Sequence, residues 1–138
     1  MISSDEVSLP AFLMWTIKNK QEDIFTLLMS KLDKEFCFNI NNYDEYGNTF
    51  LMAAIINQNV KMVNILLDHG ANIHRENNAE NTPLIIAVWN GNLEIVKLLV
   101  NAGADIEDTN NWNTSLIQIA KDNGHTEIVE YLKELKNE

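Results

Sequence analysis

A repeat of 33 residues constrains the fold of this chain more than any other feature of its sequence. The segment Thr49–Ile73 aligns without a gap on the segment Thr82–Ile106. A further 33 positions lead to Ser115, after which small and apolar side chains fall at the same slots. A fixed period of this length is typical of solenoids, in which each unit buries its apolar face against its neighbours.

A more divergent unit precedes these three. At the slots of Ile95, Leu98 and Leu99 it carries Ile24, Leu27 and Leu28. Counting back places Ala11 where the other units have threonine or serine. The unit is about five residues longer, with the excess between Leu32 and Phe38. Cys37, beside this insertion, is expected to be a small buried filler.

The repeat boundaries follow from this period. We predict one domain over residues 1–138, composed of four units. The units are expected at residues 8–43, 44–76, 77–109 and 110–138.

Each unit is predicted to form two short helices. Thr82 followed by Pro83 is a helix start, because the hydroxyl caps free amides and proline loses no hydrogen bond at the first position. This helix is expected to reach about Trp89, where residues 90–92 (Asn-Gly-Asn) favour a tight turn. Apolar residues at helical spacing follow, and Gly103 ends the second helix.

Helices this short are marginal alone, so the units must stack. Ala54, Ala87 and Ala120 recur where helices of adjacent units approach closely. Trp15 takes the slot of Ala53 and is expected in the core. Lys133 takes a slot that is apolar in the preceding units, so the last helix is expected to turn a charge outward and to end the stack of a complete protein or domain.

The charge balance disfavours polyanionic partners. The 138 residues include 20 acidic and 10 basic side chains, with a net charge of -10, which repels nucleic acid and anionic membranes. The most apolar stretch, Leu84–Trp89, is far shorter than a membrane span. Residues 1–8 do not resemble a secretory signal, and the lone cysteine cannot form an internal disulfide. A cytoplasmic protein is therefore expected.

The third unit resembles the ankyrin repeat family, whose pattern contains T-P-L-H-x-A, a glycine turn and I-V-x-L-L-L-x-x-G-A-D. The matching residues are Thr82, Pro83, Leu84, Ala87, Gly91, Ile95, Val96, Leu98, Leu99, Gly103, Ala104 and Asp105. The resemblance extends from about Ser8 to Leu135. It implies an all-α solenoid of stacked helix-turn-helix units with short β-turn fingers.

Several slots depart from the family pattern. Met14, Met52, Ile85 and Gln118 replace the histidine that family members use to tie the turns, so looser or differently bonded turns are expected. Glycine slots are filled by Lys20, Gln58, Glu80 and Asn113. The first three are expected to be strained in a left-handed conformation, which asparagine tolerates better.

The resemblance also implies a function, since family members generally bind proteins across the concave face made by fingers and inner helices. The finger positions predicted to contact a partner are Glu45, Tyr46, Asn48, Asn81, Trp112 and Thr114. The inner-helix positions predicted to do so are Ile56, Asn57, Trp89, Asn90, Asp122 and Asn123.

Four of these positions hold large apolar side chains: Tyr46, Ile56, Trp89 and Trp112. Exposed rings are the usual anchors of interfaces. The alternative is that each ring lies flat on a neighbouring turn and covers core. We expect a partner protein with apolar and basic contact groups, in the manner of an inhibitor, an adaptor or an effector that a microbe delivers into a host cell.

Other functions find less support in the sequence. The histidines His69, His74 and His125 lie in different units without ligand spacing, and no phosphate loop or nucleophile elbow occurs. We therefore predict no catalytic residue, no metal and no cofactor. A passive scaffold or a self-associating module is the remaining alternative, although the net charge favours a monomer.

Overall fold

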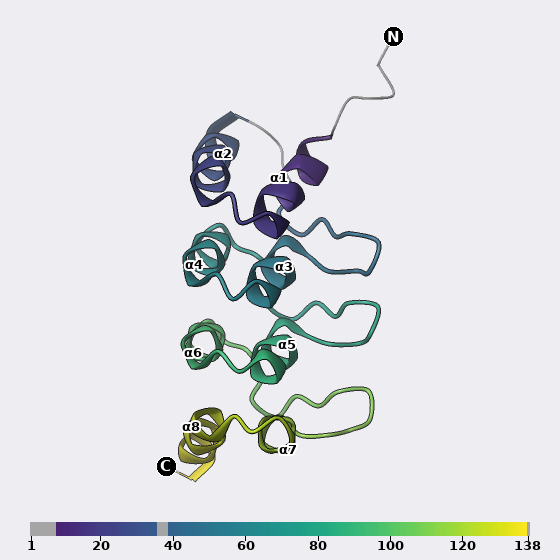
Figure 1. Ribbon diagram of the computed structural model, residues 1–138, viewed down its shortest axis with the longest axis vertical. Helices are drawn as coiled ribbons and strands as arrows, with labels where there is room; N and C mark the ends of the chain where they lie inside the picture. The colour runs from purple at the N-terminus through teal and green to yellow at the C-terminus, as the bar shows by residue number, and fades with distance from the viewer. Residues whose placement is uncertain (1–7, 36–38, 138) are drawn as a thin grey trace.

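The computed structural model describes residues 8–35 and 39–137, which form a stack of four helix pairs (Figure 1). The inner helices are α1 (Leu9–Lys18), α3 (Phe50–Ile56), α5 (Pro83–Asn90) and α7 (Leu116–Asp122). The outer helices are α2 (Glu22–Glu35), α4 (Val60–Asp68), α6 (Leu93–Asn101) and α8 (Thr126–Asn137). Each helix packs on its own partner and on the equivalent helix of the next pair. The predicted all-α solenoid of helix-turn-helix units is confirmed.

Three loops project to the same side of the stack, beside the inner helices (Figure 1). We call them the first finger (residues 43–49), the second finger (76–82) and the third finger (109–115). A single antiparallel bridge closes the first finger between Tyr43 and Thr49, and another closes the third between Thr109 and Ser115. The fingers and the inner helices thus form two walls that meet at an angle.

Hydroxyl caps begin the inner helices. Thr82 Oγ1 accepts a hydrogen bond from the Ile85 amide at 3.3 Å, as its position before Pro83 predicted. The prediction for the first unit was wrong, because Ala11 lies inside α1. Ser8 is the cap, and its Oγ accepts from the Ala11 amide at 3.2 Å. Helix α1 therefore starts about one turn earlier than the repeat period indicates.

The predicted left-handed residues are confirmed. Lys20, Gln58 and Glu80 have φ values of 57°, 55° and 63°, and Asn113 has 62°. Side chains with a Cβ atom are disfavoured in this region by about 1 to 2 kcal/mol per residue. These residues adopt a positive φ because each of the turns needs this backbone conformation to connect one element to the next.

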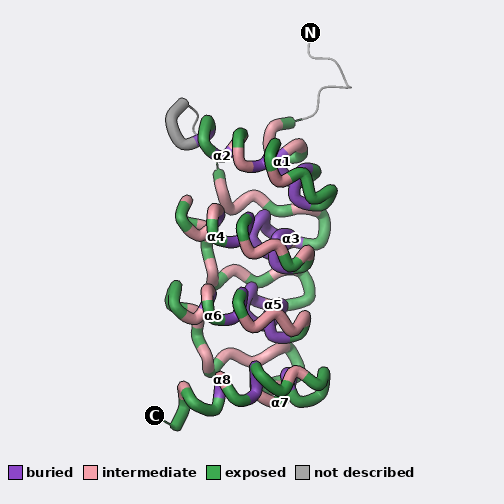
Figure 2. Tube along the Cα trace, turned by 60° about the vertical axis from the view of Figure 1, so that its left-hand side comes forward, coloured by how far each residue is buried: buried purple, intermediate pink, exposed green. Residues whose placement is uncertain are grey.

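The core lies between the two helix layers and between successive pairs (Figure 2). Ala54, Ala87 and Ala120 are fully buried, as their recurrence predicted. Lys133 is exposed on α8, also as expected.

Burial in the first pair differs from the prediction. Trp15 is 46% exposed, although its slot is buried in the other units. Ile24 and Leu27 are 37% and 57% exposed. In the described part of the chain this pair has a neighbour on one side only, so fewer slots are covered. The residues that α2 buries instead are Phe25, Met29 and Leu32.

The insertion of the first unit lengthens its outer helix. Helix α2 has 14 residues, against 9 in α4 and in α6. The helix thus takes up residues that the alignment places beyond Leu32. The prediction for Cys37 falls outside the described residues.

Candidate functional site

The four large apolar side chains singled out in the sequence all lie exposed on the walls between fingers and inner helices. Tyr46 and Trp112, on the first and third fingers, are 62% and 78% exposed. Ile56 and Trp89, near the ends of α3 and α5, are 47% and 55% exposed. Their exposure therefore disfavours the alternative that these side chains lie flat and cover core.

One hollow between the walls holds both tryptophans. We call it the tryptophan groove; its volume is about 240 Å³. Its lining residues come from the second finger, α5 and the third finger: Ala79, Asn81, Ile85, Ile86, Trp89, Asn110, Asn111 and Trp112. None of them is charged. The buried side chains of Ile85 and Ile86 form its apolar floor.

A central hollow of about 260 Å³ lies next to the first finger. Its lining residues are Lys18, Asp44, Tyr46, Asn48, Ala53, Ile56 and Asn57. Tyr46 and Ile56 thus line the same hollow. In contrast with the tryptophan groove, this hollow contains an ion pair, between Lys18 and Asp44.

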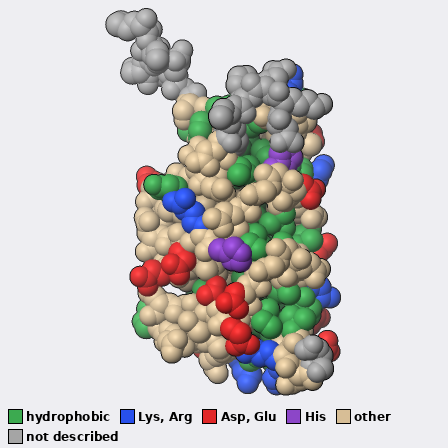
Figure 3. Space-filling model, turned by 180° about the vertical axis from the view of Figure 1, so that it is seen from behind, with side chains coloured by type: hydrophobic (Ala, Val, Ile, Leu, Met, Phe, Trp, Pro, Cys, Tyr) green, Lys and Arg blue, Asp and Glu red, His purple; other side chains and the backbone are tan. Residues whose placement is uncertain are grey.

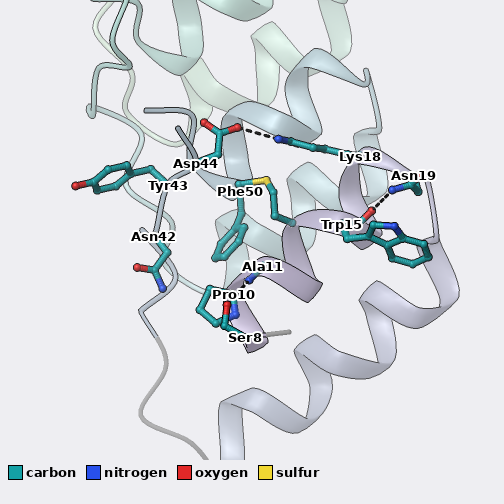
Figure 4. Close-up of a pocket in the computed structure, with 11 residues that line it drawn as sticks. Ser8, Pro10, Ala11, Trp15, Lys18, Asn19, Asn42, Tyr43, Asp44 and Phe50 are labelled. Carbon is teal, nitrogen blue, oxygen red and sulfur yellow. Dashed lines mark hydrogen bonds and ion pairs between the residues drawn. The ribbon is translucent and has the colours of Figure 1, made fainter. Parts of the chain in front are cut away.

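A larger hollow of about 470 Å³ lies at the N-terminal end, where α1 faces the first finger (Figure 4). Trp15, Tyr43 and the edge of the buried Phe50 contribute to its lining. We did not predict this hollow because Trp15 was assigned to the core. The Ser8-x-Pro10 sequence is itself a helix-start signal that could have indicated the earlier start of α1.

Several predicted site residues have their side chains in hydrogen bonds within the protein. Asn57 Nδ2 donates to the Ile17 carbonyl, and Asn123 Nδ2 donates to the Ile119 carbonyl, both at 2.8 Å. Asp122 accepts from Gln118 Nε2 at 2.8 Å.

The side chains of the remaining predicted contact residues take part in fewer hydrogen bonds within the protein. The amide of Thr114 donates to Asn110 Oδ1 at 2.9 Å, so its backbone helps to shape the third finger. Glu45 is exposed, whereas Asn90 is half-buried next to Trp89.

The first two fingers are tied together by asparagines. The Asn78 amide donates to the Tyr46 carbonyl, and Asn78 Nδ2 donates to the Glu45 carbonyl, both at 3.0 Å. Asn77 Nδ2 also donates to Asn48 Oδ1 at 2.8 Å. These bonds tie the fingers through asparagines and not through the histidine that other family members use. Differently bonded turns were expected because that histidine is absent.

A histidine joins the third and fourth pairs at another turn. His125 Nε2 lies 2.9 Å from the Trp89 carbonyl, at the end of α5. Trp89 is therefore held through its backbone while its ring is exposed.

Asp44 is held by three donors at the base of the first finger. One of them, Lys18, is seen beside Asp44 in Figure 4. Lys18 Nζ lies 3.0 Å from Oδ2, and the amides of Tyr46 and Asn48 donate to Oδ1 at 2.9 and 3.0 Å. Burial raises the pKa of Asp44, but the hydrogen bonds from Lys18, Asn48 and Tyr46 outweigh burial and hold the pKa below its usual 3.8.

This lowered pKa predicts how stability depends on pH. The stabilisation by Asp44 is complete above its unfolded pKa of about 3.9 and is lost as pH falls through the lower folded pKa. Asp44→Asn is expected to reduce the free energy of unfolding by about 1 kcal/mol at neutral pH, and by progressively less below about pH 4. Urea titrations at several pH values measure both effects. Glu134→Gln, an exposed carboxylate on α8, is the control; a parallel pH profile for both variants would contradict the assignment.

Several acidic side chains lie near the middle of the face seen from behind, beside hydrophobic side chains (Figure 3). Among the described residues, no group of three or more histidine, cysteine or acidic side chains is arranged to hold a metal ion. No described helix is long and apolar enough to span a membrane.

Comparison with protein families identifies the fold. A family model described as ankyrin repeats in three copies matches residues 13–110, more than half of the chain. The chain belongs to the ankyrin repeat family. A second model, for ankyrin repeats in many copies, matches residues 90–132. A comparison with curated proteins found no match.

Membership of the ankyrin repeat family indicates a general function. Ankyrin repeats are generally protein–protein interaction modules, and proteins built from them are typically not enzymes. In this ankyrin repeat protein, the exposed rings lie on the walls between fingers and inner helices, where such a module has room for a partner.

Proposed function

We propose that this protein binds a partner protein in the angle between its fingers and inner helices, with Trp89 and Trp112 as the main anchors. The observation that carries the proposal is the exposure of these two rings in one uncharged groove. Exposed aromatic side chains that contribute little to packing within their own protein bury a large apolar area when a partner covers them. Tyr46 and Ile56 extend the contact surface toward the first finger. The partner is expected to carry apolar and basic contact groups.

Combined Trp89→Ala and Trp112→Ala substitution tests the proposal. Each tryptophan at the centre of an interface contributes about 2 kcal/mol or more, so the double variant is expected to lose partner binding by at least about a hundredfold. The partner is recovered by cross-linking from parent-cell lysate, then purified and titrated against both proteins.

Leu27→Ala is the matched control, because this side chain is 57% exposed on the outer helix α2. It is expected to bind the partner like the unmodified protein. Circular dichroism verifies that all variants are folded. Equal affinity of the double variant and the unmodified protein would exclude these anchors.

Self-association is a second candidate, and one observation favours it. Trp15, Ile24 and Leu27 are exposed apolar side chains at the N-terminal end of the described stack. The net charge of -10 opposes contact between two copies. Light scattering over a range of concentrations distinguishes the two functions, and we expect a monomer.

A further inference from the structure

The hydrogen bonding between the fingers differs between the two gaps that separate them. Asn78 joins the second finger to the first through two hydrogen bonds. Asn111 occupies the same slot one repeat later, yet among the described residues it makes no hydrogen bond to the second finger. The bond found beside this gap lies at its base, where Thr82 Oγ1 donates to Asp108 Oδ2 at 2.8 Å. The tryptophan groove lies in this second gap.

The residue at one glycine slot accounts for the difference. A Cβ atom on Gly47 would lie 2.8 Å from the Asn78 amide nitrogen, so glycine is required for the first two fingers to approach. Glu80 stands at this slot in the second finger, with φ of 63°. By the repeat symmetry, a Cβ atom at this slot would obstruct Asn111 in the same way. The Cβ of Glu80 is therefore expected to keep the second gap open.

The lining of the groove indicates what kind of surface it takes. The rings of Trp89 and Trp112 are exposed, and among the described residues neither stacks on another aromatic ring. The side-chain amides of Asn81 and Asn111 face no hydrogen-bond partner within the described chain. A side-chain amide offers both a donor and an acceptor, which match those of a peptide group.

The unpaired amides favour an extended partner segment over a helical one. An α-helix satisfies its backbone groups internally, so it leaves few of them for Asn81 and Asn111. An extended or polyproline segment keeps its backbone groups free. Exposed aromatic rings on both sides of a groove are the usual receptors for proline-containing segments of this kind.

The charged residues near the groove indicate which side chains the ends of the bound segment carry. The groove has no charged lining residue. Two acidic residues lie near it: Glu80 in the second finger and Asp122 on the next inner helix, α7. Lys121 is the basic neighbour of Asp122, but the protein as a whole carries a charge of -10. Its field therefore attracts a segment with an uncharged centre and basic ends.

We infer that the tryptophan groove binds an extended, proline-containing segment of the partner protein, with basic residues at its ends. The inference rests on the proposed function and deepens it, since it names the segment that the groove receives. Proline and apolar side chains pack against Trp89 and Trp112, while the backbone of the segment pairs with Asn81 and Asn111.

The test uses a capped peptide of about ten residues with two Leu-Pro pairs in its centre and an arginine at each end. Titration into the isotopically labelled full chain is followed by the indole N–H signals of its tryptophans. Trp89 and Trp112 are expected to shift and Trp15 to stay, with a dissociation constant of about 10 to 100 µM. Replacing both prolines by alanine is expected to weaken binding by about tenfold or more.

Two variants of one residue test the open gap directly. Glu80→Gly removes the Cβ, lets the fingers close, and is expected to weaken peptide binding by about tenfold. Glu80→Ala keeps the Cβ and removes the same charge, and is expected to weaken binding by no more than about threefold. Equal affinities of the two variants would overturn the role assigned to the Cβ of Glu80.

The peptide series also separates this inference from the proposed function. A helical peptide of the same charge that binds as well as the proline peptide overturns the inference, as does a shift of Trp15 alone. If no peptide binds while the partner still requires Trp89 and Trp112, the inference is wrong and the proposed function stands. If the partner binds without either tryptophan, the proposed function is wrong.

Discussion

Alanine in place of Gly47 is expected to lower the free energy of unfolding by about 4 kcal/mol. The residue has φ of 77°, where a Cβ atom alone costs about 1 to 2 kcal/mol. The new Cβ would lie 2.5 Å from Asn78 Oδ1 and 2.8 Å from its backbone nitrogen. The second finger must then move away and lose the two bonds from Asn78, each worth about 1 kcal/mol. Urea denaturation of the variant measures the loss.

Gly124→Ala is the control for this prediction. Gly124 has φ of 74°, but a Cβ atom there would have no neighbour within 4 Å. The variant therefore isolates the conformational penalty and is expected to lose only about 1 to 2 kcal/mol. Equal losses at the two glycines would show that the contact between the fingers adds nothing to stability.

The fold was predictable because the period fixes several independent slots at once. The alignment of two gap-free units places caps, turns and buried alanines together, and these features depend on local sequence. The left-handed conformation of Gln58 illustrates this, since its slot corresponds to Gly91, whose φ is 84°. Local chemistry and the repeat agree there, and the prediction was correct.

Burial in the first unit was not predictable from the period. A slot alignment assumes that each unit has neighbours on both sides, whereas the first described pair packs against one neighbour. Trp15 and Ile24 are therefore exposed although the equivalent slots are buried elsewhere. The same limit explains why α2 buries a different face from the one that the alignment indicates.

The candidate site was predictable only as a set of positions. The alignment identifies Asn78 and Asn111 as the same residue at the same slot, yet only Asn78 bonds to the preceding finger. We attribute the difference to the slot in the preceding unit, where Gly47 lacks the Cβ atom that Glu80 carries. Such a contact across units appears only when the fingers are placed in three dimensions.

The sequence also could not distinguish binding residues from structural ones among the asparagines. Asn57 and Asn81 were both predicted to contact a partner. The first bonds to the Ile17 carbonyl of α1, while the second has an unpaired side-chain amide in the tryptophan groove. Only the second has its full hydrogen-bonding capacity available to a partner.

Phe50→Ala is expected to lower the free energy of unfolding by about 3 to 5 kcal/mol, because it removes a fully buried ring from the core. Phe50 is the first residue of α3, and its ring lies beside Pro10 and Ala11 of α1 (Figure 4). Contacts in a repeat stack are mainly between neighbours. The amides of α1 are therefore expected to exchange hydrogen faster than those of α7, which hydrogen-exchange mass spectrometry measures.

A proline substitution separates the ring from the helix start. Pro83 occupies the same slot in the third unit, so Phe50→Pro preserves the geometry of the first helical position. Preorganisation of this kind is worth about 1 kcal/mol at most, which is less than the burial of an aromatic ring contributes. Phe50→Pro is thus expected to be nearly as unstable as Phe50→Ala. Recovery of full stability with proline would show that the slot requires a helix-start residue and that the ring adds little to the contact between α1 and α3.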